Sequence, residues 1–345
     1  MPVAAATTFV ALCVYLLLGV LGVGAGAHAV RSGAGGQTPV ATYEERVPHV
    51  LSSVIVTGVQ GGVQGASETP PSALPPLPAS AFQAPVAEYL AYAGRQVGLA
   101  EQQIPVLERA LAAEDRAGAE EAWRSAYEDY LRLGGTYLTG QLASLNQEID
   151  GNAGGLTGGV TNPKFTGFHR IEYGLWTQAA PQSLLGLASG LGADLHTLRE
   201  VLPQVSITPL EYATRTHEIL EDAVRDLLSG VDVPWSGEGV IATAAGLEAT
   251  EELVGTLKSL LKGREGVVPL LEVQLPALAA TIHSLASAHG GRLPGNGQLT
   301  QVQAEALDAS VGAALEALAQ VPGALETELP PQTPTIPKTD LRIDP

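Results

Sequence analysis

The sequence predicts an all-α protein built from antiparallel helical bundles. Of its 345 residues, 45% are hydrophobic but only 5% are aromatic. Small apolar side chains suit closely packed helices better than a β-sandwich, which needs more β-branched and aromatic residues. Leucines recur at helical spacing in residues 220–228 and 253–261. Glycine and proline gather between such segments, and short links between long helices favour antiparallel neighbours.

The N-terminal segment, residues 1–29, is expected to be a signal peptide or a membrane anchor. Its side chains carry no formal charge, residues 9–23 are almost wholly apolar, and Ala27-His28-Ala29 fits the small-x-small rule for cleavage. The basic residues that usually precede the apolar run of a signal peptide are missing. Retention of the segment as a membrane anchor is therefore an open alternative. We expect an exported protein in the periplasm, on the cell surface or outside the cell, associated with a membrane at most through this segment.

Two Gly/Pro-rich segments flank the expected helical domain, which covers residues 84–325. Residues 30–83 are predicted to form a linker and residues 326–345 a flexible, disordered tail, because Pro-rich segments are extended and pack poorly. A break near residues 201–206 separates a first bundle of about 85–202 from a second of about 207–320. The helices are expected at 85–97, 101–114, 117–133, 137–149, 165–178, 183–201, 209–229, 237–262, 269–289 and 299–319.

Local start and stop signals support these helices. Thr208 can cap a helix, Pro209 suits its first turn, and Glu211 completes a capping box. Ser236 is a second candidate cap. Glycines that favour helix termination stand at Gly230, Gly263 and Gly290-Gly291.

Composition excludes several classes of function. The chain has 36 acidic and 18 basic residues, for a net charge of −18, whereas nucleic-acid binding needs clustered Lys and Arg. Most of these acids serve solubility, and the charge alone locates no site. The single cysteine, Cys13, lies in the N-terminal apolar run, so we expect no disulfide and no thiolate metal site. Met1 is the only methionine, which excludes a blue-copper centre.

The most informative stretch is residues 162–176, with the sequence NPKFTGFHRIEYGLW. Thr166 is the expected helix cap, and His169 and Glu172 then stand at i and i+3 on one face beside an apolar stripe. An imidazole and a carboxylate presented to one point suit a metal with nitrogen and oxygen ligands. The alternative, a surface ion pair, contributes only about 0.2–0.5 kcal/mol, and spacing alone favours that alternative.

Residues 163–172, PKFTGFHRIE, resemble the signature of the imelysin-like family, in its EfeO-type branch of extracytoplasmic iron-uptake components. The resemblance extends over about residues 85–261. It implies two four-helix bundles with a metal site between helices, and iron, as Fe²⁺ or Fe³⁺, passed to a membrane permease. A haem peroxidase of the same uptake system is a further candidate partner.

The resemblance also implies which residues bind the metal. His169 and Glu172 match the family's HxxE pair, Asp150 matches an acidic position before it, and Glu221 matches a carboxylate on a later helix. Asp150 could equally be an ordinary helix-terminal residue, and Glu221 an exposed helix charge. His217 is a secondary candidate, because it stands four residues before Glu221.

The sequence departs from the family pattern on an earlier helix. Relatives often carry a Glu-x-x-Glu pair where this chain has Leu131 and Gly134, and Glu128 lies one turn away. A second metal position is therefore in doubt, with Glu128 as its candidate. We expect no cupredoxin domain of the kind that some relatives carry, because the Cys and Met content excludes a blue-copper centre.

Several alternatives stay open. The expected ligand types would also accept zinc, manganese or copper. An imelysin-type metallopeptidase is the main alternative function, although the second histidine of a His-Glu-x-x-His motif is missing after His217. A surface- or polysaccharide-binding module is a third possibility, but it predicts more exposed aromatic residues than three tryptophans can supply.

Overall fold

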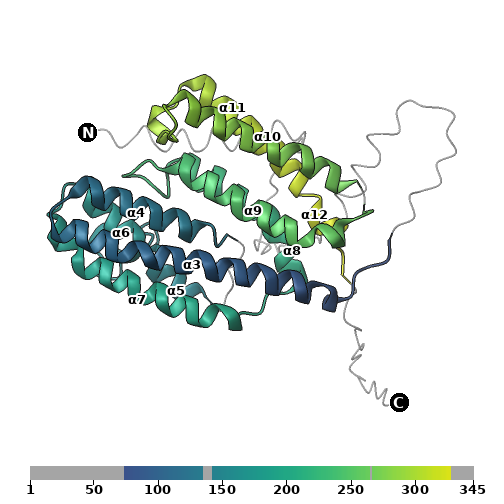
Figure 1. Ribbon diagram of the computed structural model, residues 1–345, viewed down its shortest axis with the longest axis horizontal. Coiled ribbons are helices and arrows are strands. Elements are labelled where there is room, and N and C mark those ends of the chain that lie inside the picture. The colour runs from purple at the N-terminus through teal and green to yellow at the C-terminus, as the bar shows by residue number, and fades with distance from the viewer. Residues whose placement is uncertain (1–73, 135–141, 265, 328–345) are drawn as a thin grey trace, which may run out of the picture. The chain divides into compact units, whose positions relative to one another are not determined.

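The computed structural model describes residues 74–134, 142–264 and 266–327, and this part of the chain is almost entirely helical (Figure 1). The predicted all-α class is confirmed: the described residues contain no strand, and their isolated β-bridge joins Leu77 to Thr327. Residues 1–29, and most of the expected linker and tail, lie outside the described residues.

The helices run in the order expected from the sequence, with short 3₁₀ turns between several of them. In chain order they are η1 (Ala79–Phe82), α3 (Gln83–Ala112), α4 (Arg116–Leu131), α5 (Ala143–Asp150), η2 (Gly159–Thr161), α6 (Gly167–Trp176), η3 (Pro181–Leu184), α7 (Leu185–Val201), η4 (Leu202–Gln204), α8 (Pro209–Asp222), the π-helical η5 (Ala223–Leu228), α9 (Gly239–Leu261), α10 (Val267–Ala288), η6 (Asn296–Gln298), α11 (Gln301–Leu318) and α12 (Val321–Ala324).

Helix α3 is continuous, so the expectation of two helices at 85–97 and 101–114 is wrong. A glycine in a helix costs about 1 kcal/mol relative to alanine, yet Gly98 lies between Val97 and Ala100, which are both fully buried. Packing of this face outweighs the local propensity. Helical structure also begins earlier than expected, since η1 includes residues assigned to the linker and buries Phe82.

The hydrophobic core forms two clusters. The first joins α4, α5, α6 and α7 to most of α3. The second joins α8, α10, α11 and α12 to all four buried leucines of α9. Helices α3 and α9 contribute to both clusters, and Figure 1 shows α9 between the α3–α7 group and the α10–α11 pair. The division into two separate four-helix bundles stays a prediction.

The predicted helix starts have mixed outcomes. The capping box of α8 is confirmed: Thr208 Oγ1 accepts from the Glu211 N–H at 3.3 Å, and the Glu211 carboxylate accepts from the Thr208 N–H at 2.8 Å. Thr166 takes the N-cap position of α6, but its hydroxyl donates to the Glu148 carbonyl, so it caps nothing. Ser236 is not a cap, because α9 begins after Glu238 and the Ser236 side chain is used elsewhere. The glycine stops are confirmed, with positive φ at Gly230, Gly263, Gly290 and Gly291.

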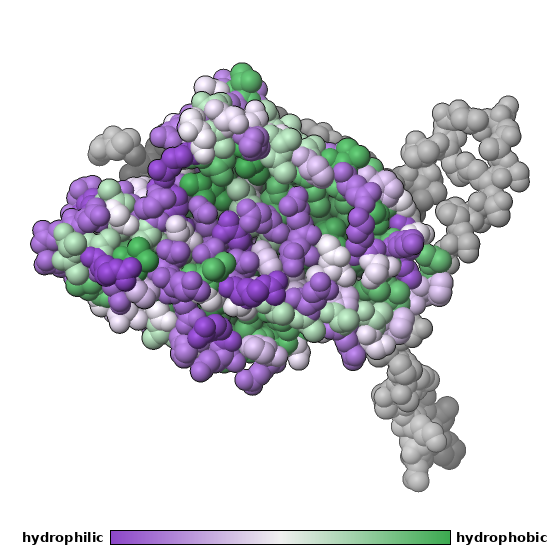
Figure 2. Space-filling view, viewed as in Figure 1, coloured by the Kyte–Doolittle hydropathy of each residue, from purple (hydrophilic) through white to green (hydrophobic). Residues whose placement is uncertain are grey.

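Helix α10 is rich in apolar residues, two of which are exposed large side chains. Among the described helices it is long and apolar enough to cross a membrane by length and composition alone, a test that core helices of soluble proteins also pass. It packs against α9 and α11, and Val273 on it is 61% exposed. Figure 2 shows a largely hydrophilic face, with hydrophobic residues visible where α9 and α10 lie in Figure 1.

Candidate metal centre

Two glycines bring the end of α5 against the start of α6. Gly151 and Gly167 have φ values of 76° and 69°, a conformation that side chains disfavour. A Cβ on Gly151 would stand 1.7 Å from the Thr166 carbonyl oxygen, and one on Gly167 would stand 2.0 Å from the Ile149 carbonyl oxygen. The two helix ends therefore meet backbone to backbone, which places the last side chain of α5 beside the first turn of α6.

The first turn of α6 is held by aromatic residues of α4. The indole N–H of Trp123 donates to the Phe168 carbonyl at 2.9 Å. The ring of Tyr127 meets the ring of His169 edge to face, with 5.6 Å between centroids and an interplanar angle of 72°. His169 is only 2% exposed, so its imidazole has a fixed place within the first core cluster.

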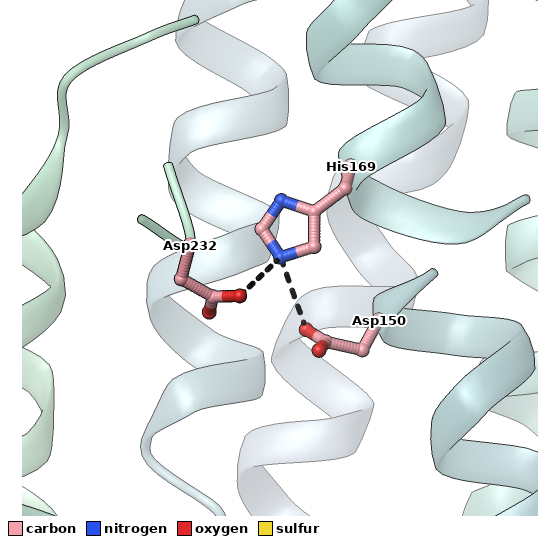
Figure 3. A group of neighbouring side chains, drawn as sticks. All are labelled: Asp150, His169 and Asp232. Carbon is pink, nitrogen blue, oxygen red and sulfur yellow. Dashed lines mark ion pairs between the residues drawn. The ribbon is translucent and has the colours of Figure 1, made fainter. Parts of the chain in front are cut away.

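Two carboxylates from separate segments converge on one nitrogen of that imidazole (Figure 3). His169 Nε2 lies 3.5 Å from Asp150 Oδ1 and 3.6 Å from Asp232 Oδ1. These separations are longer than normal hydrogen bonds. Two ligand atoms at about 2.1 Å from one metal, at a tetrahedral angle, stand about 3.4 Å apart. The ligand atoms of all three residues lie within 4.8 Å of one another, so one cation could contact them together.

Glu172 occupies the opposite side of the imidazole. Its Oε2 lies 3.0 Å from His169 Nδ1. Its Oε1 accepts from the Trp235 N–H at 3.3 Å, the Ser236 N–H at 2.8 Å and the Ser236 hydroxyl at 2.6 Å. With 0% of its surface exposed, Glu172 is placed to orient the imidazole and to keep the Nδ1 proton, which leaves Nε2 free to coordinate. Its expected role as a ligand stays a prediction that this arrangement does not favour.

Asp232 is held by groups from three parts of the chain. Its N–H donates at 2.9 Å to the carbonyl of Asp226, which lies within the π-helical turn η5. Its Oδ1 accepts from the Asn152 amide at 3.0 Å, and the Tyr127 hydroxyl lies 3.5 Å from Oδ2. Asn152 belongs to the glycine-rich stretch 151–159. That stretch thus supplies a positioning group for the cluster.

Burial and charge act against each other at this cluster. Burial disfavours the imidazolium of His169, but Asp150, Asp232 and Glu172 outweigh it and raise the pKa well above its usual value. Burial also raises the pKa of Asp150, which His169 only partly offsets. For Asp232, burial is outweighed by His169, Asn152 and Tyr127, so its pKa is lowered. The cluster is thus a strongly interacting set of charges in which each group depends on the others.

The remaining predicted ligands have partners elsewhere. His217 Nδ1 lies 3.3 Å from Glu221 Oε1, and this pair on α8 has no described contact with His169. Glu128 lies 3.7 Å from the Arg132 guanidinium, and burial raises its pKa to about 7. The structure therefore brings Asp150, His169 and Glu172 together. It does not bring His217, Glu221 or Glu128 to them, and metal binding by the latter three stays a prediction.

Sequence reasoning missed four residues of the centre: Asp232, Asn152, Tyr127 and Trp235. Asp232 is one of 36 acidic residues and stands in a loop with no motif. Ser236 was noticed only as a candidate cap. The one available signal was the glycine-rich stretch before the motif, since glycines at 151 and 167 mark a close approach of backbones.

Comparison with known proteins shows a distant relationship to an iron uptake component. No known protein-family profile matches the chain. Over 184 residues, or 53% of the chain, it is 22% identical to the iron uptake system component EfeO of Escherichia coli strain UTI89, and equally to that of strain CFT073. The match covers 48% of those proteins, so the chain spans about half the length of the curated relatives it matches. The chain is therefore distantly similar to EfeO iron uptake components.

Proposed function

We propose that this protein binds a metal ion through Asp150, His169 and Asp232, as part of an iron-uptake system. The observation that supports this most is His169 Nε2, a buried atom with no hydrogen-bond partner among the described residues and two carboxylates facing it. A buried polar atom without a partner costs free energy. A cation between the three groups would remove that cost and neutralise both carboxylates.

Iron is the proposed cargo because of the similarity to proteins named as iron uptake components. One nitrogen and two oxygen donors suit iron, and they also suit zinc and manganese. In this proposal the protein is exported, holds the ion outside the cytoplasm and passes it to a membrane permease, with a haem peroxidase as a further partner. Glu172 of the HxxE pair serves as the residue that positions His169.

Titration calorimetry with ferrous, ferric and zinc ions tests the site directly. The wild-type chain should bind, while His169→Ala and Asp232→Asn should lose most of the affinity and keep the helical circular dichroism spectrum. Unchanged binding in His169→Ala would remove the assignment. Peptide hydrolysis by the metal-loaded protein would instead support a metallopeptidase, and metal-independent polysaccharide binding would support a surface-binding module.

A further inference from the structure

A cavity of about 350 Å³ adjoins the three-residue cluster, and Asp150 and Asp232 lie in its wall. The wall carries four aspartates against a single arginine, Arg225. That arginine is already paired with Asp222 at 2.7 Å and with Asp226 at 2.6 Å. The charge of the cavity therefore favours a cation and disfavours an anionic ligand.

Asn146 is the unexplained group in this wall. It stands four residues before Asp150 on α5, which places both side chains on one helix face. It lines the same cavity and is only 9% exposed. Neither Oδ1 nor Nδ2 of its amide has a hydrogen-bond partner among the described residues. Burying an amide without partners is unfavourable, so this side chain is suited to contact a group bound in the cavity.

We infer that Asn146 is a further binding residue of this centre, an inference that rests on the proposed function. The bound ion keeps water ligands on the side that faces the cavity. Three protein ligands fill only half of an octahedral shell. The cavity has room for about ten water molecules. The amide of Asn146 contacts either the ion, through Oδ1, or a water that the ion holds. The ligand class is a hard, oxygen-preferring cation that arrives and leaves with part of its hydration shell.

Terbium ion alone is a suitable probe of the full-length chain, because it is a hard cation whose emission neighbouring aromatic rings sensitise. Tyr127 is well placed, with its hydroxyl 3.5 Å from Asp232. Luminescence lifetimes in light and heavy water count the water ligands of the bound ion. We expect about two or more waters on wild-type protein, since a hard cation in an open site keeps several. A count below one would overturn the hydrated state.

Asn146→Leu, which keeps the branched arrangement of heavy atoms but has no polar atoms, should weaken terbium binding by about 10- to 100-fold. Gln147→Leu is the matched control, because Gln147 lines the same cavity but is exposed, and its affinity should stay near wild type. An unchanged affinity in Asn146→Leu would overturn the role of Asn146. If Asn146→Leu binds terbium normally but His169→Ala does not, the role of Asn146 is wrong and the proposed metal site stands. If His169→Ala also binds terbium as the wild type does, the proposed function itself is wrong.

Discussion

Replacing Glu172 with glutamine tests how the imidazole is prepared for a metal. The Glu172 carboxylate accepts a hydrogen bond from His169 Nδ1 at 3.0 Å, so the lone pair of the neutral ring stands on Nε2 and faces Asp150 and Asp232. A glutamine amide has one oxygen and one NH₂ group. If its oxygen keeps the three donors from Trp235 and Ser236, its NH₂ group faces Nδ1 and forces the proton onto Nε2.

The opposite amide orientation is costlier. It turns the NH₂ group toward three donors, two of them from Ser236, and loses three hydrogen bonds. Each lost bond costs about 1–3 kcal/mol in a buried site. The first orientation is therefore preferred, and coordination through Nε2 must give up the bond between the amide and Nδ1. That loss predicts a fall of about 10- to 100-fold in metal affinity for Glu172→Gln.

Zinc titration calorimetry measures the affinity, and nitrogen NMR of the His169 ring reads the tautomer, at a pH that leaves the imidazole neutral. Ser236→Ala is the control, since it removes one donor to Glu172 without changing the group that faces Nδ1. It should cost about 1 kcal/mol of stability and leave the affinity near wild type. Normal zinc affinity in Glu172→Gln would refute the positioning role. So would a proton that stays on Nδ1 of His169 in the metal-free variant.

Three further predictions concern the centre and its surroundings. Asp232→Asn should lower metal affinity by about 100-fold or more. Asp226→Asn should lower it far less, because Asp226 holds Asp232 through its backbone carbonyl and its carboxylate is already paired with Arg225; calorimetry compares the two. Gly167→Ala should lower the free energy of unfolding by about 2–4 kcal/mol in chemical denaturation, since the added Cβ would meet a carbonyl oxygen at 2.0 Å. Gly190→Ala is the control: its Cβ would enter open space, and the change should stabilise α7 by about 0.5–1 kcal/mol. The pKa of Glu128 is raised from 4.5 to about 7, so its ionisation destabilises the folded state progressively as the pH rises across that interval. Glu128→Gln should therefore stabilise the protein by about 1 kcal/mol near pH 8, after discounting for solvent screening, and by little near pH 4.5. Thermal melts at the two pH values measure the difference.

The helices could be predicted because their signals are local. The capping box at Thr208, the glycine stop at Gly263 and the leucine periodicity of α9 each depend on a few neighbouring residues. The error in α3 has the opposite origin. Gly98 weakens a helix locally, but the burial of Val97 and Ala100 against other helices decides the outcome. Tertiary packing is not visible in a window of ten residues.

The residues of the candidate metal centre also differ in whether the sequence reveals them. His169 and Glu172 share one turn of α6, but their spacing alone favours a surface ion pair. They could be found, and Asp150 with them, because residues 163–172 resemble a family signature. Asp232 could not, since its position depends on the Asp226 carbonyl and on an amide 80 residues earlier in the chain. The order of contacts around Glu172 was equally hidden, because its donors come from a loop more than 60 residues later.

The strongest reason to regard this cluster as a binding centre is that the fold prevents it from satisfying itself. A shift of about half an ångström would turn the contact between His169 Nε2 and either aspartate into an ordinary hydrogen bond. Asp150 is fixed by the glycine contact between α5 and α6, and Asp232 is held back by Asn152 and Tyr127. Groups kept apart at the spacing of metal ligands, at a cost in free energy, indicate that something other than stability determines their positions.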